Sequence, residues 1–464
     1  MRQTNLALAI LTAAVLSACG GSDDNTPAAQ PKPKFASQVS FGDSLSDVGT
    51  YKVGTVAALG GGKYTINGNN TAVNATLTGK NWTELMAAQF GLAAPCAAQT
   101  GLDGDPTKGF AVPVTNNLAC TGYAQGGARV TDPKGPGNKL TGSALGQLTV
   151  PVVTQVATHL ARNGGKFTGN EVVFVMAGGN DALQLLADLT AAAQAAGAAE
   201  GAKVGASTYI TSLVGKLAAG ATNPTTAAAA IGLAAQTAAA QPGATSTTIT
   251  TAAVTAAAQQ PGNAAVGSPA VYGPMTVAAQ AEATAAGNAA GAKAGADYAA
   301  ANGPGLVPKM AAAGTELANL VRNEIVGKGA NYVVLVNLPD LATTPSGKSQ
   351  SASSQQLIAG MVSGFNIALR VGVDGLESKV LPVDLYTVSV DEIANPAKYG
   401  ITNTTTPACG TNALGGTSLV CNATNVVAGD VSHYLFADTV HPTPFGNSLI
   451  AKYVADQMAV RGWL

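Results

Sequence analysis

Val39-Ser40-Phe41-Gly42-Asp43-Ser44-Leu45-Ser46-Asp47 lies close to the start of the 464-residue chain and joins an apolar run to a glycine and a serine. Residues 37–41 predict a buried strand that stops at a tight turn, which would hold Ser44 at the carboxyl end of the strand. Reactive groups collect at this edge of open α/β sheets. An Asp-Ser turn that only caps the next helix would give the same pattern.

A second motif, Phe436-Ala437-Asp438-Thr439-Val440-His441-Pro442-Thr443, lies near the other end of the chain. Of the three histidines (His159, His433 and His441), only His441 has an acid three residues before it. A serine hydroxyl is a poor nucleophile unless a base takes its proton and a third group orients that base. Asp438 and His441 can supply the orienting group and the base from one short loop.

The chain resembles GDSL-type SGNH hydrolases, a family of serine esterases and lipases. Four sequence blocks carry this resemblance and occur in the family's order. The blocks are Phe41-Gly42-Asp43-Ser44-Leu45-Ser46-Asp47, Gly122-Tyr123-Ala124-Gln125-Gly126-Gly127-Ala128, Gly178-Gly179-Asn180-Asp181, and Asp438 to His441.

The resemblance implies the fold, the chemistry and the site. It implies a flavodoxin-like, three-layer α/β/α fold with a mostly parallel five-stranded sheet. The substrate would be an acyl ester, cleaved through an acyl-serine intermediate without a metal or other cofactor. Ser44 would be the nucleophile, with Asp438 and His441 completing a triad. The oxyanion donors would be the backbone N–H groups of Ser44 and Gly127 and the Asn180 amide.

Strands and helices alternate along the rest of the chain, which independently predicts a doubly wound parallel sheet. Residues 171–177 and 332–338 are continuous apolar runs, as expected for strands covered on both faces. Further strands are predicted at 123–130 and 379–388, and helices at 82–90, 150–160, 354–369 and 442–457. On these helices, we expect Trp82 in the core and His159 on the solvent-exposed surface.

The N-terminus has the pattern of a bacterial export signal. Arg2 precedes an apolar run too short to span a bilayer as a helix. Leu16-Ser17-Ala18-Cys19-Gly20 resembles a lipobox, which implies cleavage before Cys19 and lipid attachment to its sulfur. The predicted divisions are a signal peptide (1–18), a lipidated tether (19–35) and a hydrolase domain (36–464) in the cell envelope, on an outer-membrane anchor. The alternative is an ordinary cleaved signal and a secreted protein.

Four cysteines remain after Cys19. In an exported chain, an even number of cysteines indicates disulfides, and loop closure favours Cys96–Cys120 and Cys409–Cys421. A zinc site is disfavoured, because no cysteine pair has close ligand spacing. The formal net charge of −1, with 11% charged residues, argues against nucleic-acid binding.

Residues 191–303 are rich in alanine, threonine and glycine. Alanine favours helix, so we expect helical hairpins inserted between two strands and packed on the body or on lipid. A disordered linker is the competing interpretation. If helical, the insertion is either a lid that shelters an acyl chain or a structural appendage.

Other functions fit parts of the same pattern. The predicted site would also serve a carbohydrate O-acetyl esterase or an acyltransferase. A non-catalytic surface lipoprotein that binds through the 191–303 region is a third possibility, which the absence of esterase activity would favour.

Overall fold

The computed structural model describes residues 32–68 and 75–464. The predicted signal peptide and lipid-attachment cysteine lie outside these residues. The central sheet has the order β1-β4-β5-β6, and every pairing in it is parallel. The predicted α/β class is therefore confirmed. The strands are β1 (Gln38–Gly42), β4 (Val172–Met176), β5 (Tyr332–Val336) and β6 (Val380–Val383).

The expected fifth strand is reduced to a single bridge, so the sheet has four strands. The segment runs beside β1, where the Tyr123 N–H donates to Ser40 O at 2.8 Å, but only Ser40 and Gly122 form a bridge. The chain then turns away at Gly126. The strand predicted at 379–388 is also shorter, because the side chain of Asp384 caps a helix that begins at the next residue.

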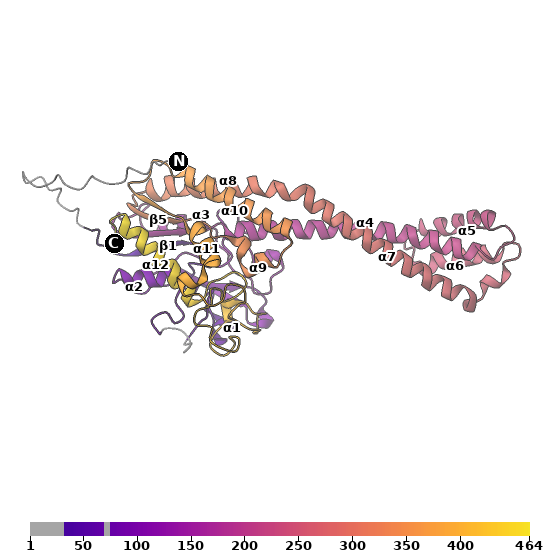
Figure 1. Ribbon diagram of the computed structural model, residues 1–464, viewed down its shortest axis with the longest axis horizontal. Coiled ribbons are helices and arrows are strands. Elements are labelled where there is room, and N and C mark those ends of the chain that lie inside the picture. Colours follow the sequence, from indigo (N-terminus) through magenta and orange to yellow (C-terminus); the bar gives the residue numbers. More distant parts are fainter. Residues whose placement is uncertain (1–31, 69–74) are drawn as a thin grey trace, which may run out of the picture.

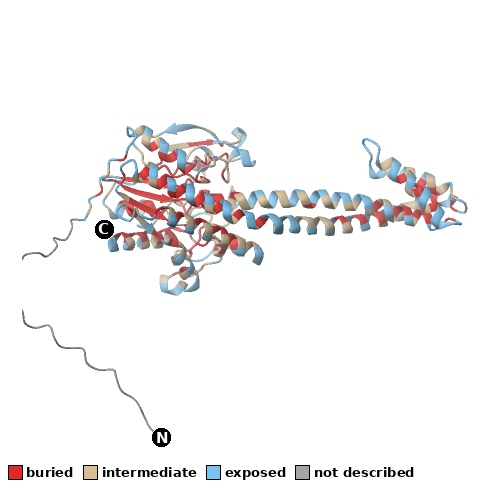
Figure 2. Ribbon diagram, turned by 90° about the horizontal axis from the view of Figure 1, so that it is seen from above, coloured by how far each residue is buried: buried red, intermediate tan, exposed pale blue. Residues whose placement is uncertain are grey.

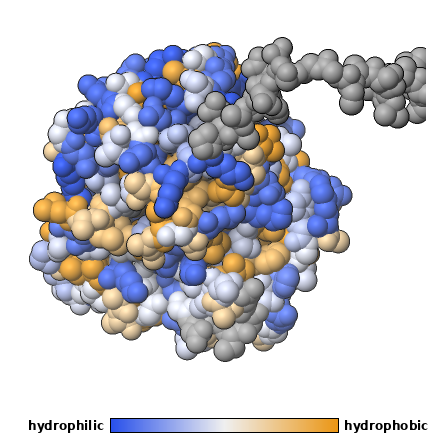
Figure 3. Space-filling view, turned by 90° about the vertical axis from the view of Figure 1, so that its left-hand side faces the viewer, coloured by the Kyte–Doolittle hydropathy of each residue, from blue (hydrophilic) through white to orange (hydrophobic). Residues whose placement is uncertain are grey.

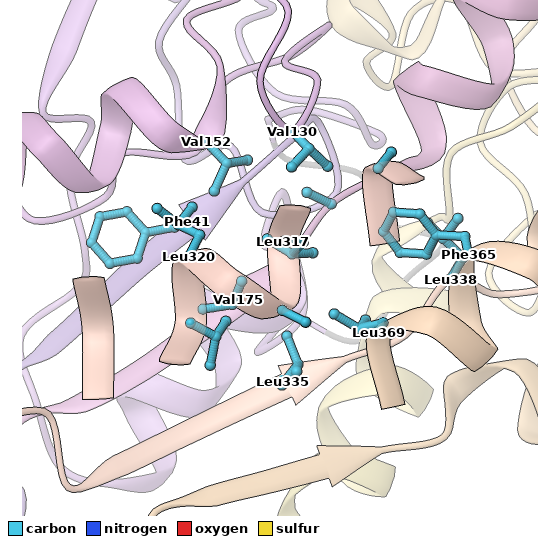
Figure 4. Packing of buried hydrophobic residues seen from close by; sticks show 14 of the residues in the cluster. Phe41, Val130, Val152, Val175, Leu317, Leu320, Leu335, Leu338, Phe365 and Leu369 are labelled. Carbon is cyan, nitrogen blue, oxygen red and sulfur yellow. The ribbon is translucent and has the colours of Figure 1, made fainter. Parts of the chain in front are cut away.

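Two helical layers cover the sheet. Alternate strand residues point to opposite faces, so Val173 and Val175 join one hydrophobic cluster while Phe174 and Met176 join another. Figure 4 shows the first cluster, in which side chains such as Leu317 pack on the strands. The helices on this face are α3 (Val152–Arg162), α8 (Leu306–Leu320) and α10 (Ala352–Gly372), and a π-helical segment (Val321–Val326) continues α8. The other face of the sheet is covered by α2 (Trp82–Gln89), α11 (Leu385–Ala394) and α12 (Pro444–Val460).

The alanine-rich region is helical and extends away from the body as a long projection (Figure 1). The region is therefore helical and not a disordered linker, and it does not pack along the body; the alternative expectation, packing on lipid, stays a prediction. Two helices run side by side to the tip, where a separate cluster of buried residues lies (Figure 2). The projection comprises α4 (Gly179–Ala218), α5 (Pro224–Ala239), α6 (Ser246–Ala258) and α7 (Pro269–Asn302).

Glycines explain how the two long helices approach so closely. A Cβ at Gly201 would lie 2.9 Å from the carbonyl oxygen of Gly287, and one at Gly197 would lie 2.7 Å from that of Gly291. Such contacts are too short for any side chain. The glycine content of this region therefore reflects helix packing rather than a flexible linker.

Both predicted cysteine pairings are present, Cys96–Cys120 and Cys409–Cys421. None of the helices in the described ranges combines the length and apolar character needed to cross a membrane. Seen from the end opposite the projection, the body shows apolar patches between polar side chains (Figure 3). Other short elements include the antiparallel pair β2 (Gln99–Asp103) and β3 (Ala111–Asn116), α1 (Gly54–Ala58) and α9 (Pro345–Lys348).

Candidate active site

Ser44, His441 and Asp438 come together at the carboxyl end of β1, although 397 residues separate the serine from the histidine. His441 Nε2 lies 2.8 Å from Ser44 Oγ, and His441 Nδ1 lies 2.8 and 2.9 Å from the two Asp438 oxygens. With the Nδ1 proton directed to Asp438, Nε2 has a free lone pair and can accept a hydrogen bond from the Ser44 hydroxyl. The Ser44 residue is 8% exposed and the His441 side chain 16% exposed, so Ser44 is buried and His441 keeps part of its surface exposed.

Asp438 is fixed by backbone donors from two segments. Its Oδ1 accepts the N–H groups of Val440 and His441 at 2.9 and 2.8 Å, and its Oδ2 accepts the Ser418 N–H at 2.8 Å. The first two bonds form a tight turn within the Asp-x-x-His loop. The sequence gives no hint of Ser418, because its backbone N–H, and not its side chain, makes the contact.

The turn that carries Ser44 depends on Gly42. This glycine has φ +149°, and a Cβ there would lie 2.1 Å from the carbonyl oxygen of Met176 at the end of β4. Gln155 on α3 holds the Gly42 backbone on both sides, accepting its N–H at 2.9 Å and donating to its carbonyl at 2.8 Å. Asp47 closes the turn by accepting backbone N–H groups of Gly49, Thr50 and Gly126.

Each of the three predicted oxyanion donors has an N–H without an acceptor in the described part of the chain. In the described parts of the chain, neither the Ser44 N–H nor the Gly127 N–H donates to an acceptor. The Asn180 amide donates one proton to Ala128 O at 2.9 Å, which leaves its second proton free. Asp181 holds the adjacent loop by accepting from Arg129 Nε at 3.0 Å and from the Val130 N–H at 3.1 Å.

Neighbouring carboxylates set the acid–base properties of His441. Burial alone would lower its pKa, but the charge and hydrogen bond of Asp438 and the charge of Asp43 raise it above 6.5. Burial would raise the pKa of Asp438, yet His441 and the surrounding hydrogen bonds hold it well below its usual range. Burial raises the pKa of Asp43 to about 7. His441 is therefore a stronger base than a free histidine.

Tyr64 is a site residue that the sequence did not reveal. Its ring centroid lies 4.8 Å from that of His441, and its hydroxyl contacts Gln147. A Cβ on Gly126 would lie 2.2 Å from the Tyr64 hydroxyl, so this glycine makes room for the ring. The surrounding sequence is typical of a loop, and no motif in it predicts that Tyr64 lies beside His441.

His159 was expected to be solvent-exposed, but it is buried. Its ring stacks on Phe167 with centroids 4.5 Å apart and meets Phe41 and Tyr123 edge-on. Burial lowers its pKa to about 4. Trp82 is fully buried, as predicted. Within the described residues, no group of three or more His, Cys, Asp or Glu side chains is placed to hold a metal ion.

Comparisons with known proteins point to ester hydrolases. No protein-family model matches the chain. GDSL esterase/lipase At2g40250 of Arabidopsis thaliana is 40% identical over 81 residues, 18% of this chain and 22% of that protein. GDSL esterase/lipase APG of the same plant is 25% identical over 144 residues, 29% and 41% of the two chains. Esterase EstA of Pseudomonas aeruginosa is 34% identical over 132 residues, 27% and 19%.

The chain thus spans less than half the length of each of these relatives. Within that limit, the similarity to plant and bacterial proteins of this type supports a GDSL-type hydrolase that acts on esters.

Proposed function

We propose that this protein is a serine esterase that hydrolyses acyl esters through an acyl-serine intermediate. The observation that carries the proposal is the 2.8 Å contact between Ser44 Oγ and His441 Nε2, with Asp438 on the other ring nitrogen. The partial similarity to GDSL esterases and lipases agrees with it.

Acylation begins when His441 Nε2 takes the Ser44 proton and Oγ attacks the ester carbonyl carbon. The carbonyl π electrons move to the oxygen, which the N–H groups of Ser44 and Gly127 and the free Asn180 proton stabilise. One such donor contributes about 100- to 1000-fold in rate. Asp438 stabilises the imidazolium. Collapse of the intermediate breaks the bond to the alcohol oxygen, and His441 protonates the departing alcohol.

Deacylation repeats these steps with water. His441 removes a proton from water, the hydroxide oxygen attacks the acyl carbon, and the bond to Ser44 Oγ breaks. The proton returns to Ser44, and the carboxylic acid leaves. Every proton in the cycle passes through His441 Nε2, so the mechanism needs no group beyond these residues and water.

The test is hydrolysis of p-nitrophenyl butyrate by the purified protein and by Ser44→Ala and His441→Ala. Each substitution should lower kcat by roughly a thousandfold or more, because the nucleophile and its base act as one unit. His433→Ala, on an exposed histidine outside the site, is the matched control and should retain activity. Near-normal turnover by His441→Ala would refute the mechanism.

For location, the proposal is an envelope lipoprotein anchored through Cys19, based on the lipobox-like sequence. Labelling cells with a radioactive fatty acid should mark the wild type but not Cys19→Ser. Equal labelling of the two would reject the anchor.

A further inference from the structure

A cavity of about 1230 Å³ begins at the base of the projection and continues along it. Its inner part lies between the start of α4, α10 and the loop that precedes His441, with Leu186, Leu357 and Val440 in its wall. Its outer part runs along the groove between α4 and α7 as far as Tyr209. These are the two helices that lie side by side in Figure 2.

The lining of this cavity is mostly apolar, with some neutral polar side chains, and it carries no charge. None of its residues is Asp, Glu, Lys, Arg or His. A charged ligand would find no counter-ion there, whereas an apolar chain would leave water for a matching surface. The inner wall is richest in leucine, with Leu183, Leu186, Leu189, Leu341 and Leu357.

The cavity adjoins the candidate active site at two points. Val440 directly precedes His441, and Ala182 follows Asn180 by two residues on the same helix. The inner end of the cavity therefore lies within two residues of His441 and Asn180, on the side toward which an acyl chain on Ser44 would have to extend to reach it. From Ala182 to Tyr209 the groove follows α4 for about 40 Å, at about 1.5 Å of rise per residue. That length exceeds what a short acyl chain would fill.

We propose that this cavity binds the acyl chain of the ester, which makes long-chain fatty acyl esters the substrate class. The inference rests on the proposed esterase function. Each methylene group buried in the groove should improve binding by about fourfold. The preference should therefore appear as a rise of kcat/KM from p-nitrophenyl butyrate to p-nitrophenyl palmitate.

The test introduces bulk into the groove without changing the catalytic residues. Ala187 is exposed and lines the cavity, so Ala187→Trp should lower kcat/KM for palmitate by about tenfold or more, far beyond its effect on butyrate. Ala198→Trp, about 16 Å farther along α4, should act in the same direction but more weakly. Ala199→Trp is the matched control, because Ala199 is exposed on the same helix outside the lining, and it should behave as wild type.

The possible outcomes separate this proposal from the proposed function. If butyrate is hydrolysed but Ala187→Trp affects both esters equally, or no more than Ala199→Trp does, the groove proposal is overturned and the esterase stands. If the wild type hydrolyses no ester, binding of the fluorescent fatty acid cis-parinarate decides. Weaker binding by Ala187→Trp than by Ala199→Trp would support the groove. Absence of binding by the wild type would overturn it.

Discussion

Two carboxylates, Asp438 and Asp43, affect the pH range in which His441 can act as a base. Asp438 touches Nδ1, and Asp43 acts through its charge from the turn that carries Ser44. Asp43 is buried, and its pKa of about 7 means that its own charge develops near neutrality. The basicity of His441 is thus tied to the ionisation of Asp43 as well as to its contact with Asp438.

The charge state of His441 should make hydrolysis depend on pH. Only neutral His441 can accept the Ser44 proton, so kcat/KM should rise with pH through an apparent pKa above 6.5. Asp43→Asn removes a charge that raises the His441 pKa, while its side-chain oxygen can still accept the Leu45 N–H. The rise should then shift to lower pH. A pH–rate profile with p-nitrophenyl butyrate measures the apparent pKa of the wild type and of Asp43→Asn. An identical apparent pKa in the two proteins would contradict the coupling between Asp43 and His441.

His159 should make the fold sensitive to acid. Its pKa is about 4 in the folded protein against 6.5 for the free side chain, so the unfolded state binds the proton more tightly between these values. Stability is therefore fully present above pH 6.5 and is lost as pH falls toward 4, by on the order of 3 kcal/mol. His159→Phe keeps an aromatic ring and removes the titration. Between neutral pH and pH 5, the free energy of unfolding in urea should fall less for this variant than for the wild type. An equal fall in the two proteins would be inconsistent with the prediction.

The difference between His441 and His159 shows what sequence can reveal about single residues. The Asp-x-x-His motif and Gly-Asp-Ser-Leu predicted a serine, a base and an acid, and the structure brings these side chains together. The buried position of His159 depends on Phe41, Tyr123 and Phe167, which come from three separate segments. No local pattern around His159 predicts that pocket, because tertiary packing creates it.

At the scale of elements, the Cys409–Cys421 disulfide braces the loop that carries Asp438. The Cys409 N–H donates to Ala437 O at 2.8 Å, next to Asp438 in sequence. Cys421 ends the short turn that begins with Ser418, whose N–H holds the Asp438 carboxylate. Both ends of the crosslink therefore lie within a few residues of groups that position the triad.

Loss of this crosslink should affect catalysis more than loss of the other one. Closing loops of this size contributes about 3 kcal/mol of stability. Cys409→Ser/Cys421→Ser should lower both the melting temperature and kcat, because the Ser418 N–H is no longer held against Asp438. The matched control, Cys96→Ser/Cys120→Ser, should lower the melting temperature with a smaller effect on kcat. Equal kcat losses in folded preparations of the two variants would count against a positioning role.

Strands and helices were predictable to different degrees. Continuous apolar runs identified β4 and β5, because strands buried on both faces leave little room for polar residues. The expected fifth strand is short because its pairing with β1 ends at the hydrogen bond from the Gln125 N–H to Gly42 O, where the chain turns at Gly126 and Gly127. For the projection, composition predicted helix but not direction. The low number of charged residues suggested that the region packs against the body. Instead, α4 and α7 pack against each other, because glycines at their interface allow the close approach.

For the whole molecule, the body and the tip of the projection have separate cores. The two clusters that cover the sheet and the cluster at the tip share no residue, and the tip cluster begins at Tyr209 and ends at Ala283. Between them, α4 and α7 run side by side (Figure 2), and glycines at their interface let the two backbones approach closely. The body therefore has its own source of stability, and the four sequence blocks of the site all lie in it or at its junction with α4.

This separation predicts that the body survives removal of the projection. Gln194 and Gly295 are suitable ends, because the two helices are adjacent there: a Cβ at Gly295 would lie 3.1 Å from Ala193 O. Replacing residues 195–294 with a short Gly/Ser linker should leave a folded protein that hydrolyses p-nitrophenyl butyrate, since Ser44 and His441 keep their neighbours. Hydrolysis of the palmitate ester should fall more, because the outer groove is gone. Circular dichroism establishes folding, and Ser44→Ala in the shortened chain is the control for background hydrolysis. A folded variant without butyrate hydrolysis would show that the projection takes part in catalysis itself.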